Sequence, residues 1–441
     1  MSLLLTFYGD DFTGSTDALE QLNMAGIQSA LFTSPPTAEQ MRRFDGLQAI
    51  GVAGRTRALR PKAMTRELRP AFQRLKDLRP RHVHYKVCST FDSSPDAGNL
   101  GTVIALGFEV FQTRFIPILA AAPALGRFTV FGNHFAQFGI GSGGEIHRLD
   151  RHPSVSRHPI TPMREADLRL HLARQTKEAV GLFDVLKLSL PMQKRTTALE
   201  GLLAAGARVV LFDALTMDHV ERVGELMDAF ASEQAPMFSM GSSAIETALA
   251  SMTSKRPRAV KPRRTGISAG EPVLVASGSC SPVTLRQIRS AVRSGFVEVP
   301  LDVRALGAAR SRANEIVRAS NAALAALEKE RSVVIHTTRH GRAERLSSHF
   351  PKGTAEVLGN ALGSVLRNVL AKNRVHRVCL AGGDTSSYAA RALGLEALEM
   401  IAPLTPGAPL CRARAPGSPL DGREVVFKGG QVGVENYFEQ L

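Results

Sequence analysis

Short apolar runs alternate with helical patterns along most of this chain, and this alternation limits its fold more than any other feature. The runs have the length of buried strands, and the stretches between them show the apolar spacing of amphipathic helices. The predicted strands are Leu3 to Tyr8, Gln28 to Phe32, Ala49 to Ala53, His82 to Lys86, Phe128 to Phe131, Val185 to Leu188, Val209 to Phe212, Val273 to Ala276, Val297 to Pro300, Val333 to Thr337, Arg377 to Ala381 and Val425 to Phe427. Strands that alternate with helices form a mainly parallel sheet with helices on its faces. The sequence therefore predicts an α/β fold.

One stretch, Lys255 to Gly270, interrupts the alternation. It is rich in Pro, Gly, Lys and Arg, a composition typical of a linker. The chain has 441 residues, which is too long for one ordinary domain. We therefore predict two doubly wound domains, each with a mainly parallel sheet, over residues 1–260 and 265–441.

The net charge is +15, from 55 Lys and Arg against 40 Asp and Glu, and it raises the question of an anionic partner. The densest basic cluster, Lys255 to Arg264, contains two prolines and is typical of a solvated linker. Tryptophan is absent and there are only four tyrosines, so basic patches interleaved with stacking aromatics are lacking. We expect small anions as ligands and no nucleic acid.

Hydropathy and cysteine usage bear on location. No apolar run reaches the roughly 18 residues that a membrane span requires, and Met1 to Tyr8 lacks a basic region before its apolar part. The four cysteines are widely spaced and form no metal-binding pattern. We expect no membrane partner, a cytoplasmic location with reduced thiols, and a homodimer as one candidate assembly.

Ligands of open α/β sheets bind outside the carboxyl ends of the strands, so polar residues just after each strand are the candidates for chemistry. The first strand is followed by Gly9 to Asp17, which carries the adjacent carboxylates Asp10 and Asp11. Side chains alternate along a strand, so we expect these two to point different ways. One of them could accept a proton from an attacking hydroxyl or bind a sugar hydroxyl. The alternative is that Asp11, together with nearby hydroxyls, only caps the following helix.

Three further loops in the first half follow predicted strands. After the third strand, Arg55 is in place to bind a carboxylate through two hydrogen bonds, whereas Arg57 is as readily explained as a surface residue. After the fourth strand, Lys86 opens a hydroxyl-rich loop and could neutralise an acid or a phosphate. Asn133 and His134 follow another strand, and a structural role for the histidine is about as plausible as a functional one.

Three glycine-rich loops follow strands in the second half. They are Ser277 to Pro282, Ala381 to Ser387, and Lys428 to Gly430 together with Pro406 and Gly407. Small residues before a helix let backbone N–H groups approach phosphate oxygens. The first of these loops matches neither the phosphate-binding loop with its lysine nor the usual dinucleotide motif. Their number in one domain predicts a site for a nucleotide polyphosphate.

Taken in order, these segments resemble the four-carbon acid sugar kinase family. The family shows D-D-F-T-G near its N-terminus, then K-x-x-S-T-F-D-S-x-P-x-G-N-x-G, H-P-x-T-P-M, S-G-S-x-S, G-G-[ED]-T and K-x-G-x-x-G. The corresponding segments here are Asp10–Gly14, Lys86–Gly101, His158–Met163, Ser277–Ser281, Gly382–Thr385 and Lys428–Gly433. The match spans nearly the whole chain.

The resemblance implies a substrate-binding first domain and a nucleotide-binding second domain, with the active site in the cleft between them. It implies transfer of the γ-phosphate of ATP, with Mg²⁺, to the terminal hydroxyl of threonate, erythronate or 3-oxo-tetronate. Asp11 and Asp10 would be catalytic. The substrate would be surrounded by Asp10, Asp11, Arg55, Lys86 and Ser89, with Asn133 and His134 as further candidates from the strand ends. ATP would be held by Ser279, Ser281, Gly382, Gly383, Asp384, Thr385, Gly429 and Gly430.

The sequence departs from the common family pattern at several of these segments. Gly9 stands where alanine is frequent, Asp384 where glutamate is frequent, and Gly429 where serine is frequent. These differences leave the identity of the sugar acid open, because specificity depends on small differences in pocket contacts. A non-catalytic nucleotide or metabolite sensor on the same fold is the alternative function.

Overall fold

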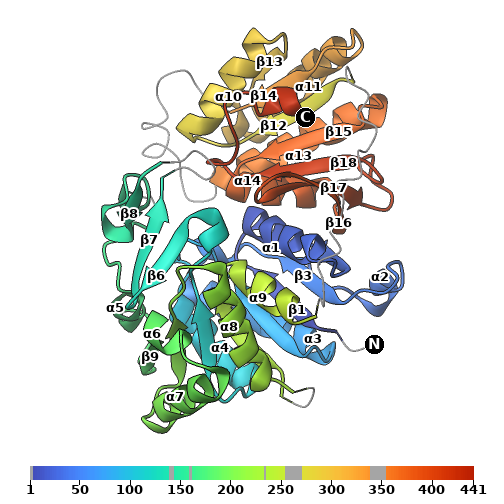
Figure 1. Cartoon of the computed structure of the whole chain (residues 1–441). Helices are drawn as coiled ribbons and strands as arrows, with labels where there is room; N and C mark the ends of the chain where they lie inside the picture. Colours follow the sequence, from blue (N-terminus) through green and yellow to red (C-terminus); the bar gives the residue numbers. More distant parts are fainter. Residues whose placement is uncertain (1–2, 139–143, 158–160, 233–234, 254–270, 338–353) are drawn as a thin grey trace. The chain divides into compact units, whose positions relative to one another are not determined.

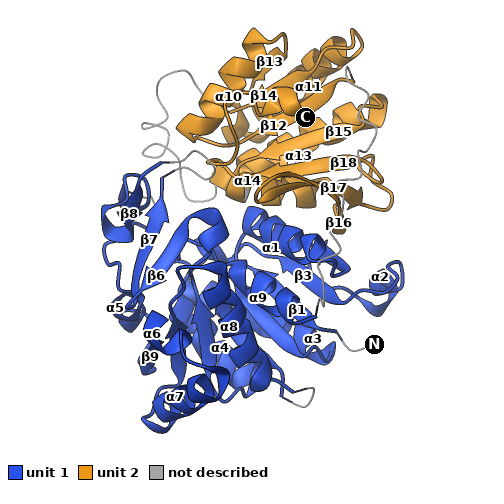
Figure 2. Cartoon of the chain, in the orientation of Figure 1, with its two compact units in different colours: residues 1–260 blue, residues 261–441 orange. Residues whose placement is uncertain are grey.

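The computed structural model describes residues 3–138, 144–157, 161–232, 235–253, 271–337 and 354–441. The chain forms two compact units, Met1–Val260 and Lys261–Leu441 (Figures 1 and 2). The predicted linker and the first half of the His158–Met163 segment lie outside the described residues.

Unit 1 is built on a parallel sheet with the strand order β2-β3-β1-β4-β11-β5-β10-β9. Its strands are β1 (Leu5–Gly9), β2 (Ser29–Phe32), β3 (Ala49–Ala53), β4 (His82–Lys86), β5 (Ile116–Leu119), β9 (Val180–Phe183), β10 (Val209–Phe212) and β11 (Met237–Gly241). Every residue of β1, β3, β4 and β11 is buried, so these central strands are covered on both faces. The predicted α/β class is confirmed.

The helices of unit 1 pack in rows, with α1 against α9 and α9 against α8, while α3 packs against α4. The helices are α1 (Phe12–Met24), α2 (Ala38–Met41), α3 (Pro61–Asp77), α4 (Leu100–Phe111), α5 (Leu168–Ala173), α6 (Val185–Leu188), α7 (Met192–Ala204), α8 (Met217–Ala229) and α9 (Ala244–Thr253). In the core, the rings of Tyr8 and Tyr85 stack with centroids 6.1 Å apart, and Phe72 meets Tyr85 edge-on. This packing holds β1 and β4 side by side beneath the loops that follow them.

Two predicted strands of the first half are corrected by the structure. Residues Val185–Leu188 form helix α6, because Asp184 accepts hydrogen bonds from the backbone N–H groups of Leu186 and Lys187 and so caps a helix start. Residues Phe128–Phe131 do not join the parallel sheet. They overlap β6 (Arg127–Val130), which pairs antiparallel with β7 (Asn133–Gln137), and β7 pairs with β8 (Ile146–Arg148).

Within unit 2 the strand order is β13-β14-β12-β15-β18-β17-β16. The first five strands in this order are parallel, and β16 and β17 form an antiparallel hairpin beside β18. The strands are β12 (Val273–Ser277), β13 (Val297–Pro300), β14 (Val333–His336), β15 (Arg377–Ala381), β16 (Ala397–Thr405), β17 (Ala408–Arg414) and β18 (Glu424–Lys428). The helices are α10 (Pro282–Arg293), α11 (Ala309–Leu327), α13 (Thr354–Lys372) and α14 (Gly383–Ala392).

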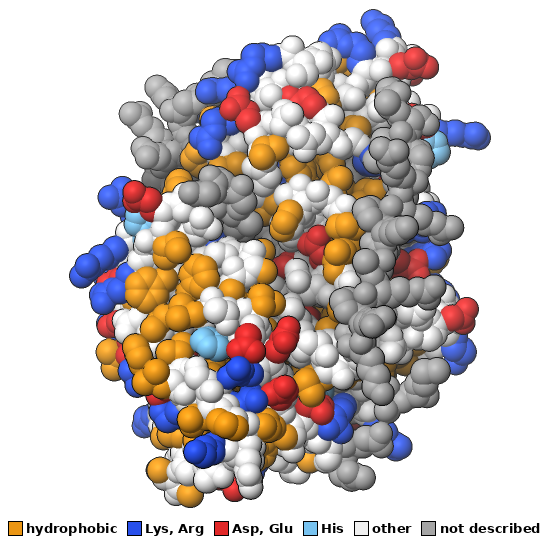
Figure 3. Space-filling view, in the orientation of Figure 1, with side chains coloured by type: hydrophobic (Ala, Val, Ile, Leu, Met, Phe, Trp, Pro, Cys, Tyr) orange, Lys and Arg blue, Asp and Glu red, His pale blue; other side chains and the backbone are white. Residues whose placement is uncertain are grey.

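Surface and hydropathy add two observations. Among the described residues, no helix combines the length and the apolar character that a membrane crossing needs. On the face drawn in Figure 3, basic side chains are interspersed with acidic ones rather than gathered in one patch.

Candidate functional site

The carboxyl ends of β1, β3 and β4 lie next to one another in unit 1. Gly9 of β1 is in register with Ala53 of β3 on one side and with Lys86 of β4 on the other. The loops that begin at Asp10, Gly54 and Val87 therefore leave the sheet at the same edge. The buried strands fix where these loops start, which gives the side chains that follow them a rigid base.

Arg57 joins the two adjacent aspartates in one buried cluster. Its Nε and Nη2 donate to the two carboxylate oxygens of Asp10 over 3.0 and 2.8 Å, and its Nη1 donates to Oδ2 of Asp11 over 2.8 Å. Asp10 is 3% exposed and Asp11 is 4% exposed, so these pairs are largely shielded from water. A bidentate arginine–carboxylate pair of this kind fixes orientation as well as charge.

Asp11 also forms the start of helix α1. Its Oδ1 accepts from the backbone N–H of Gly14 over 2.8 Å, and its Oδ2 accepts from the hydroxyl of Thr13 over 2.9 Å. Capping and pairing with Arg57 thus occur in the same side chain. Strand alternation does not extend to Asp10 and Asp11, because β1 ends at Gly9. Instead of pointing different ways as expected, both carboxylates accept from the guanidinium of Arg57.

The two carboxylates differ in proton affinity. Burial raises the pKa of Asp10 to about 6, against the lowering effect of Arg57 and with a further rise from Asp11. Burial also acts on Asp11, but Arg57, Lys86 and the N–H of Gly14 outweigh it and hold the pKa of this carboxyl below its usual value. Asp10 is therefore the stronger base of the pair.

Arg55 and Arg57 differ in exposure in the opposite sense to the one expected, since Arg57 is the more buried of the two. Arg55 is paired with Glu67, its Nε lying 3.2 Å from Oε2, and its side chain is 45% exposed. The side chain of Arg57, which sequence reasoning treated as equally consistent with the surface, is only 20% exposed. Arg55 directly precedes the 3₁₀ turn Thr56–Ala58, whereas Arg57 lies within it and donates its backbone N–H to the carbonyl of Asp10 over 3.1 Å.

Lys86 is buried at the end of β4. Its Nζ donates to the carbonyl of Val87 over 3.0 Å and lies 3.7 Å from Oδ2 of Asp17. Burial acts to lower the pKa of Lys86, but Asp17 and the other nearby anionic groups raise it overall. The lysine is therefore a fixed positive charge beside the aspartate pair.

His134 lies in the interior of unit 1. It is 0% exposed, its Nδ1 lies 2.9 Å from the hydroxyl of Thr129, and its Nε2 donates to the carbonyl of Ser89 over 2.8 Å. Burial lowers the pKa of His134 to about 4. Both ring nitrogens are used within the protein, which supports the structural role for this histidine. Asn133, at the start of β7, is partly exposed, as is Ser89.

In unit 2, three loops meet at the carboxyl ends of β12, β15 and β18. Ser281 caps α10 by accepting from the N–H of Val283 over 3.2 Å. A Cβ on Gly430 would lie 2.9 Å from Oγ of Ser279, and one on Gly382 would lie 2.5 Å from Oγ1 of Thr385. Gly382 also has φ +129°, a conformation that glycine adopts readily. The backbone conformation therefore favours glycine at Gly382, and at Gly430 a Cβ would require the side chain of Ser279 to shift.

The remaining predicted nucleotide residues lie in the same loops. Gly383 is the first residue of helix α14, and Asp384 follows it in the first turn. Gly429 follows β18 directly, and its carbonyl accepts from Nζ of Lys428 over 2.9 Å. Pro406 and Gly407 form the turn between β16 and β17, and Ala408 lies two residues before Leu410, which pairs with Val426. This turn therefore lies toward the carboxyl end of β18.

Lys428 was missed as a site residue. It ends β18, is 0% exposed, and its Nζ lies 3.2 Å from Oγ1 of Thr284 in α10. The available signal was a lysine at a strand end, as at Lys86 in the first half, here followed directly by two glycines.

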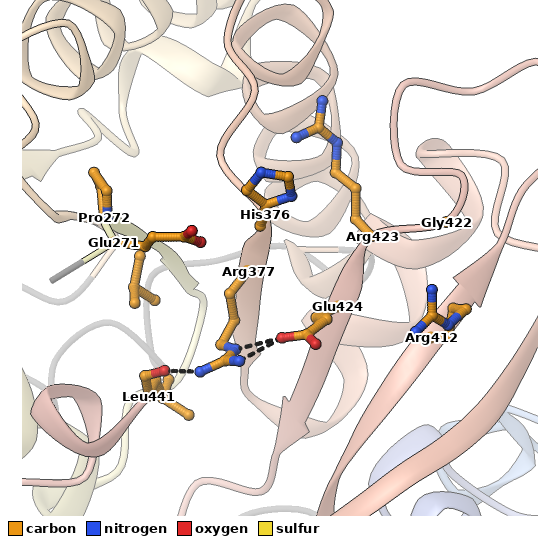
Figure 4. Close-up of a pocket in the computed structure, with 10 residues that line it drawn as sticks. Glu271, Pro272, His376, Arg377, Arg412, Gly422, Arg423, Glu424 and Leu441 are labelled. Carbon is orange, nitrogen blue, oxygen red and sulfur yellow. Dashed lines mark hydrogen bonds and ion pairs between the residues drawn. The ribbon is translucent and has the colours of Figure 1, made fainter. Parts of the chain in front are cut away.

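A cavity of about 260 Å³ lies elsewhere on unit 2, and Figure 4 shows its lining. It is formed by residues at the amino ends of β12, β15 and β18, among them Val273, Arg377 and Glu424. Arg377 donates to Glu424 and to the carbonyl of Leu441 in this lining. The cavity is therefore at the opposite edge of the sheet from the glycine-rich loops. Among the described residues, no group of three or more metal-binding side chains is found.

Two family models cover the chain. The model described as a sugar-binding N-terminal domain matches residues 5–249, and the one described as a nucleotide-binding C-terminal domain matches residues 274–438.

Curated relatives match over almost the full length. A 3-oxo-isoapionate kinase from Paraburkholderia graminis is 39% identical, covering 99% of this chain and 93% of the relative. A 3-oxo-tetronate kinase from Methylobacterium radiotolerans is 30% identical, covering 99% of this chain and 98% of the relative. A 3-oxo-tetronate kinase from Salmonella typhimurium is 27% identical over 97% of this chain and 96% of its own length.

Solved structures share the fold. A Salmonella typhimurium protein described as a putative tRNA synthase superposes with a TM-score of 0.77 at 25% identity, covering 99% of this chain and 98% of that one. A Haemophilus influenzae protein superposes with a TM-score of 0.69 at 23% identity, also over 99% and 98% of the two chains. The matches to both domain models and to kinases along the whole chain confirm the resemblance: this chain belongs to the four-carbon acid sugar kinase family.

Proposed function

We propose that this chain is an ATP-dependent kinase that phosphorylates a hydroxyl of a short 3-oxo sugar acid. The observation that carries the proposal is Asp10, a buried carboxylate of raised pKa at the carboxyl end of β1, within the part that matches a sugar-binding domain. The kinases quoted above support the substrate class, because both of their names denote 3-oxo sugar acids. We put 3-oxo-isoapionate first and 3-oxo-tetronate second, following the order of sequence identity.

In the proposed reaction, Asp10 accepts the proton of the attacking hydroxyl. The hydroxyl oxygen forms a bond to the γ-phosphorus, the bond from that phosphorus to the β–γ bridging oxygen breaks, and ADP leaves. A pKa of about 6 keeps Asp10 mostly ionised at neutral pH while giving it more affinity for a proton than an ordinary aspartate. Asp11 holds the loop and Arg57 in position by accepting hydrogen bonds from Thr13, Gly14 and Arg57 with its carboxylate and from Ser15 with its carbonyl.

The acid group of the substrate needs a cation. Arg55 is our candidate, because its guanidinium is half exposed at the same sheet edge as Asp10. Lys86 is 2% exposed and paired with Asp17, and we assign it a longer-range electrostatic role instead. Ser89 and Asn133 remain candidates for contacts with the sugar hydroxyls, since both are partly exposed.

We assign ATP to the loops of unit 2 that contain Ser279, Ser281, Gly382, Gly383, Asp384, Thr385, Gly429 and Gly430. The cap of α10 and the close-packed glycines support this assignment, because backbone N–H groups at a helix start favour phosphate. Mg²⁺ would arrive with the nucleotide and neutralise charge on its phosphates. Such an ion keeps several waters and needs only one or two protein carboxylates.

A coupled assay for ADP tests the proposal. The panel contains 3-oxo-isoapionate, 3-oxo-tetronate, threonate and erythronate, each with ATP and Mg²⁺. We expect kcat/KM for at least one 3-oxo acid to exceed that for threonate and erythronate by about tenfold or more, a difference that one well-placed polar contact supplies. ATP binding without turnover of any member would reject the kinase and favour the sensor.

A further inference from the structure

Lys428 carries a positive charge that no described carboxylate balances. Among the residues that the structure describes, none of the ion pairs involves it, although its side chain is fully buried. Its Nζ donates to Oγ1 of Thr284 over 3.2 Å and to the carbonyl of Gly429 over 2.9 Å. Two of the three ammonium protons are thus used, both on neutral acceptors.

The described side chains next to Lys428 are all uncharged at neutral pH. The ring of Tyr437 has its centroid 5.7 Å from Nζ, and α10 offers only the hydroxyl of Thr284. From β15, Cys379 faces the lysine, and burial raises the pKa of this thiol to about 12, so it stays uncharged at neutral pH. Burial lowers the pKa of Lys428 to about 8.

A buried charge without a partner is costly, so it usually marks either a functional group or an absent counter-ion. The location of Lys428 points to the second explanation. Thr284, which accepts from Nζ, itself donates to the carbonyl of Gly430 over 2.9 Å, and Gly430 approaches Ser279 and Ser281. The ammonium group therefore lies directly beneath the place where two of the phosphate-binding loops meet.

We propose that Lys428 is the positive charge of the nucleotide site and that the phosphates of the bound nucleotide are its counter-ion. This inference rests on the proposed binding of ATP in unit 2. The positive charge of the lysine attracts the phosphates electrostatically. Its hydrogen bonds to Thr284 and Gly429 also keep the loops in position. It is thus a positioning residue, and its effect falls on phosphates rather than on the adenosine part.

A consequence is that nucleotide binding takes up a proton. Free Lys428, with a pKa of about 8, is roughly half deprotonated at pH 8. A polyanion beside it raises its pKa and restores the proton. We expect an uptake of about 0.5 proton per ADP at pH 8 and close to none at pH 6 from this group.

The test is isothermal titration of the full-length protein with Mg·ADP at pH 6 and pH 8, each in two buffers of different ionisation enthalpy. Adenosine is titrated in parallel. Lys428→Met removes the charge but keeps a side chain of similar length, and Lys372→Met removes an exposed lysine of α13 as the matched control. We expect K428M to weaken ADP about tenfold or more, to leave adenosine within about twofold, and to abolish the proton uptake. K372M should behave as the wild type.

Three results would overturn the assignment while leaving ATP binding intact: wild-type ADP binding with no proton uptake at pH 8, uptake that persists in K428M, or equal weakening of ADP and adenosine. The uptake in the wild type needs no variant, so a failure of K428M to fold does not remove the test. No binding of ADP to the wild type would instead reject the proposed function itself.

Discussion

Asp10 and Asp11 follow each other in sequence and share one arginine, but their remaining partners differ. Asp11 receives a backbone N–H and a hydroxyl in addition to Arg57, and each of these favours its ionised form. Both oxygens of Asp10 face Arg57, and burial still raises its pKa. The same guanidinium therefore serves a fixed anion and a base that can exchange a proton.

This difference predicts two distinct pH profiles. If Asp10 must be ionised to accept the proton, kcat/KM falls as pH drops through about 6. Asp10→Asn should lower kcat about 100-fold or more and remove this acid limb. Asp11→Asn should lower activity through a displaced loop while its residual rate keeps the acid limb. Rates of the three proteins from pH 5 to 8 measure this, and an unchanged limb in Asp10→Asn would assign the base elsewhere.

Arg57 and Arg55 form a matched pair for a stability experiment. Arg57→Met leaves two buried carboxylates without their cation and should cost about 3–5 kcal/mol in the free energy of unfolding. Arg55→Met removes a half-exposed pair with Glu67 and should cost about 0–1 kcal/mol. Urea denaturation at pH 7.5 measures both. Similar losses in the two variants would contradict the deeper placement of Arg57.

At the scale of residues, the sequence predicted that the candidate side chains follow neighbouring strands, but it did not predict their hydrogen-bond partners. Asp10, Asp11 and Lys86 stand at neighbouring strand ends as predicted, because parallel strands bring their carboxyl ends to one edge. The choice between Arg55 and Arg57 depends on a 3₁₀ turn of three residues, for which a single sequence gives little signal. The proton affinities depend on burial, which is a property of the folded chain.

The loop from Lys86 to Gly101 is held by two buried histidines. His134 donates to the carbonyl of Ser89, and Nε2 of His171 lies 2.7 Å from the hydroxyl of Ser93. Burial lowers the pKa of each histidine to about 4. Both are therefore neutral in the folded protein at pH values where they would be charged in the unfolded chain.

This predicts a loss of stability in mild acid. The folded pKa lies below the unfolded value of about 6.5, so the contribution is complete above pH 6.5 and is lost as pH falls toward 4. The loss should reach roughly 3 kcal/mol per histidine. His134→Gln should flatten the decline in unfolding free energy between pH 7 and 5, whereas His376→Gln, at an exposed position, should not. An equally steep decline in His134→Gln would argue against this account.

The serine-rich loop before α10 carries a chemical probe of its own. Cys280 is exposed, Cys379 and Cys411 are buried, and Cys88 is partly buried. If the loop binds phosphates, Mg·ADP should slow alkylation of Cys280 several-fold, while the other thiols react slowly with or without nucleotide. Peptide mass spectrometry after timed alkylation measures the rate at each cysteine. Unchanged labelling of Cys280 at saturating ADP would place the nucleotide away from this loop.

Helices and strands with a strong apolar pattern could be predicted from the sequence. The elements that were predicted wrongly or missed have causes in the neighbouring residues. Helix α3 begins at Pro61, and proline at the first position suits a helix start. Residues Val185–Leu188 have the apolar character of a strand, but the cap from Asp184 makes them a helix. Strands β5 and β11 were missed, because short apolar runs next to proline or glycine give an ambiguous signal.

At the scale of the whole molecule, the candidate groups lie in two different units. The aspartate pair belongs to unit 1, which matches a sugar-binding domain, and Lys428 belongs to unit 2, which matches a nucleotide-binding domain. The two-domain organisation could be predicted because the strand–helix alternation is interrupted once and then resumes. The identity of the sugar acid could not, since it depends on contacts that strand-end motifs do not specify.

We therefore expect a substitution in one unit to weaken the binding of that unit's ligand and to leave the binding of the other ligand nearly unchanged. Asp10→Asn should leave the Kd for Mg·ADP within about threefold, because the substitution removes a charge from unit 1 alone. Lys428→Met should weaken ADP and leave the Kd for the 3-oxo sugar acid within the same limit. Each Kd is measured by calorimetry with one ligand at a time, and Lys62→Met, at an exposed position of α3, serves as the surface control in unit 1. If Asp10→Asn weakened ADP as strongly as Lys428→Met does, the two groups would act on one shared ligand, and the assignment of sugar acid to unit 1 and nucleotide to unit 2 would have to be abandoned.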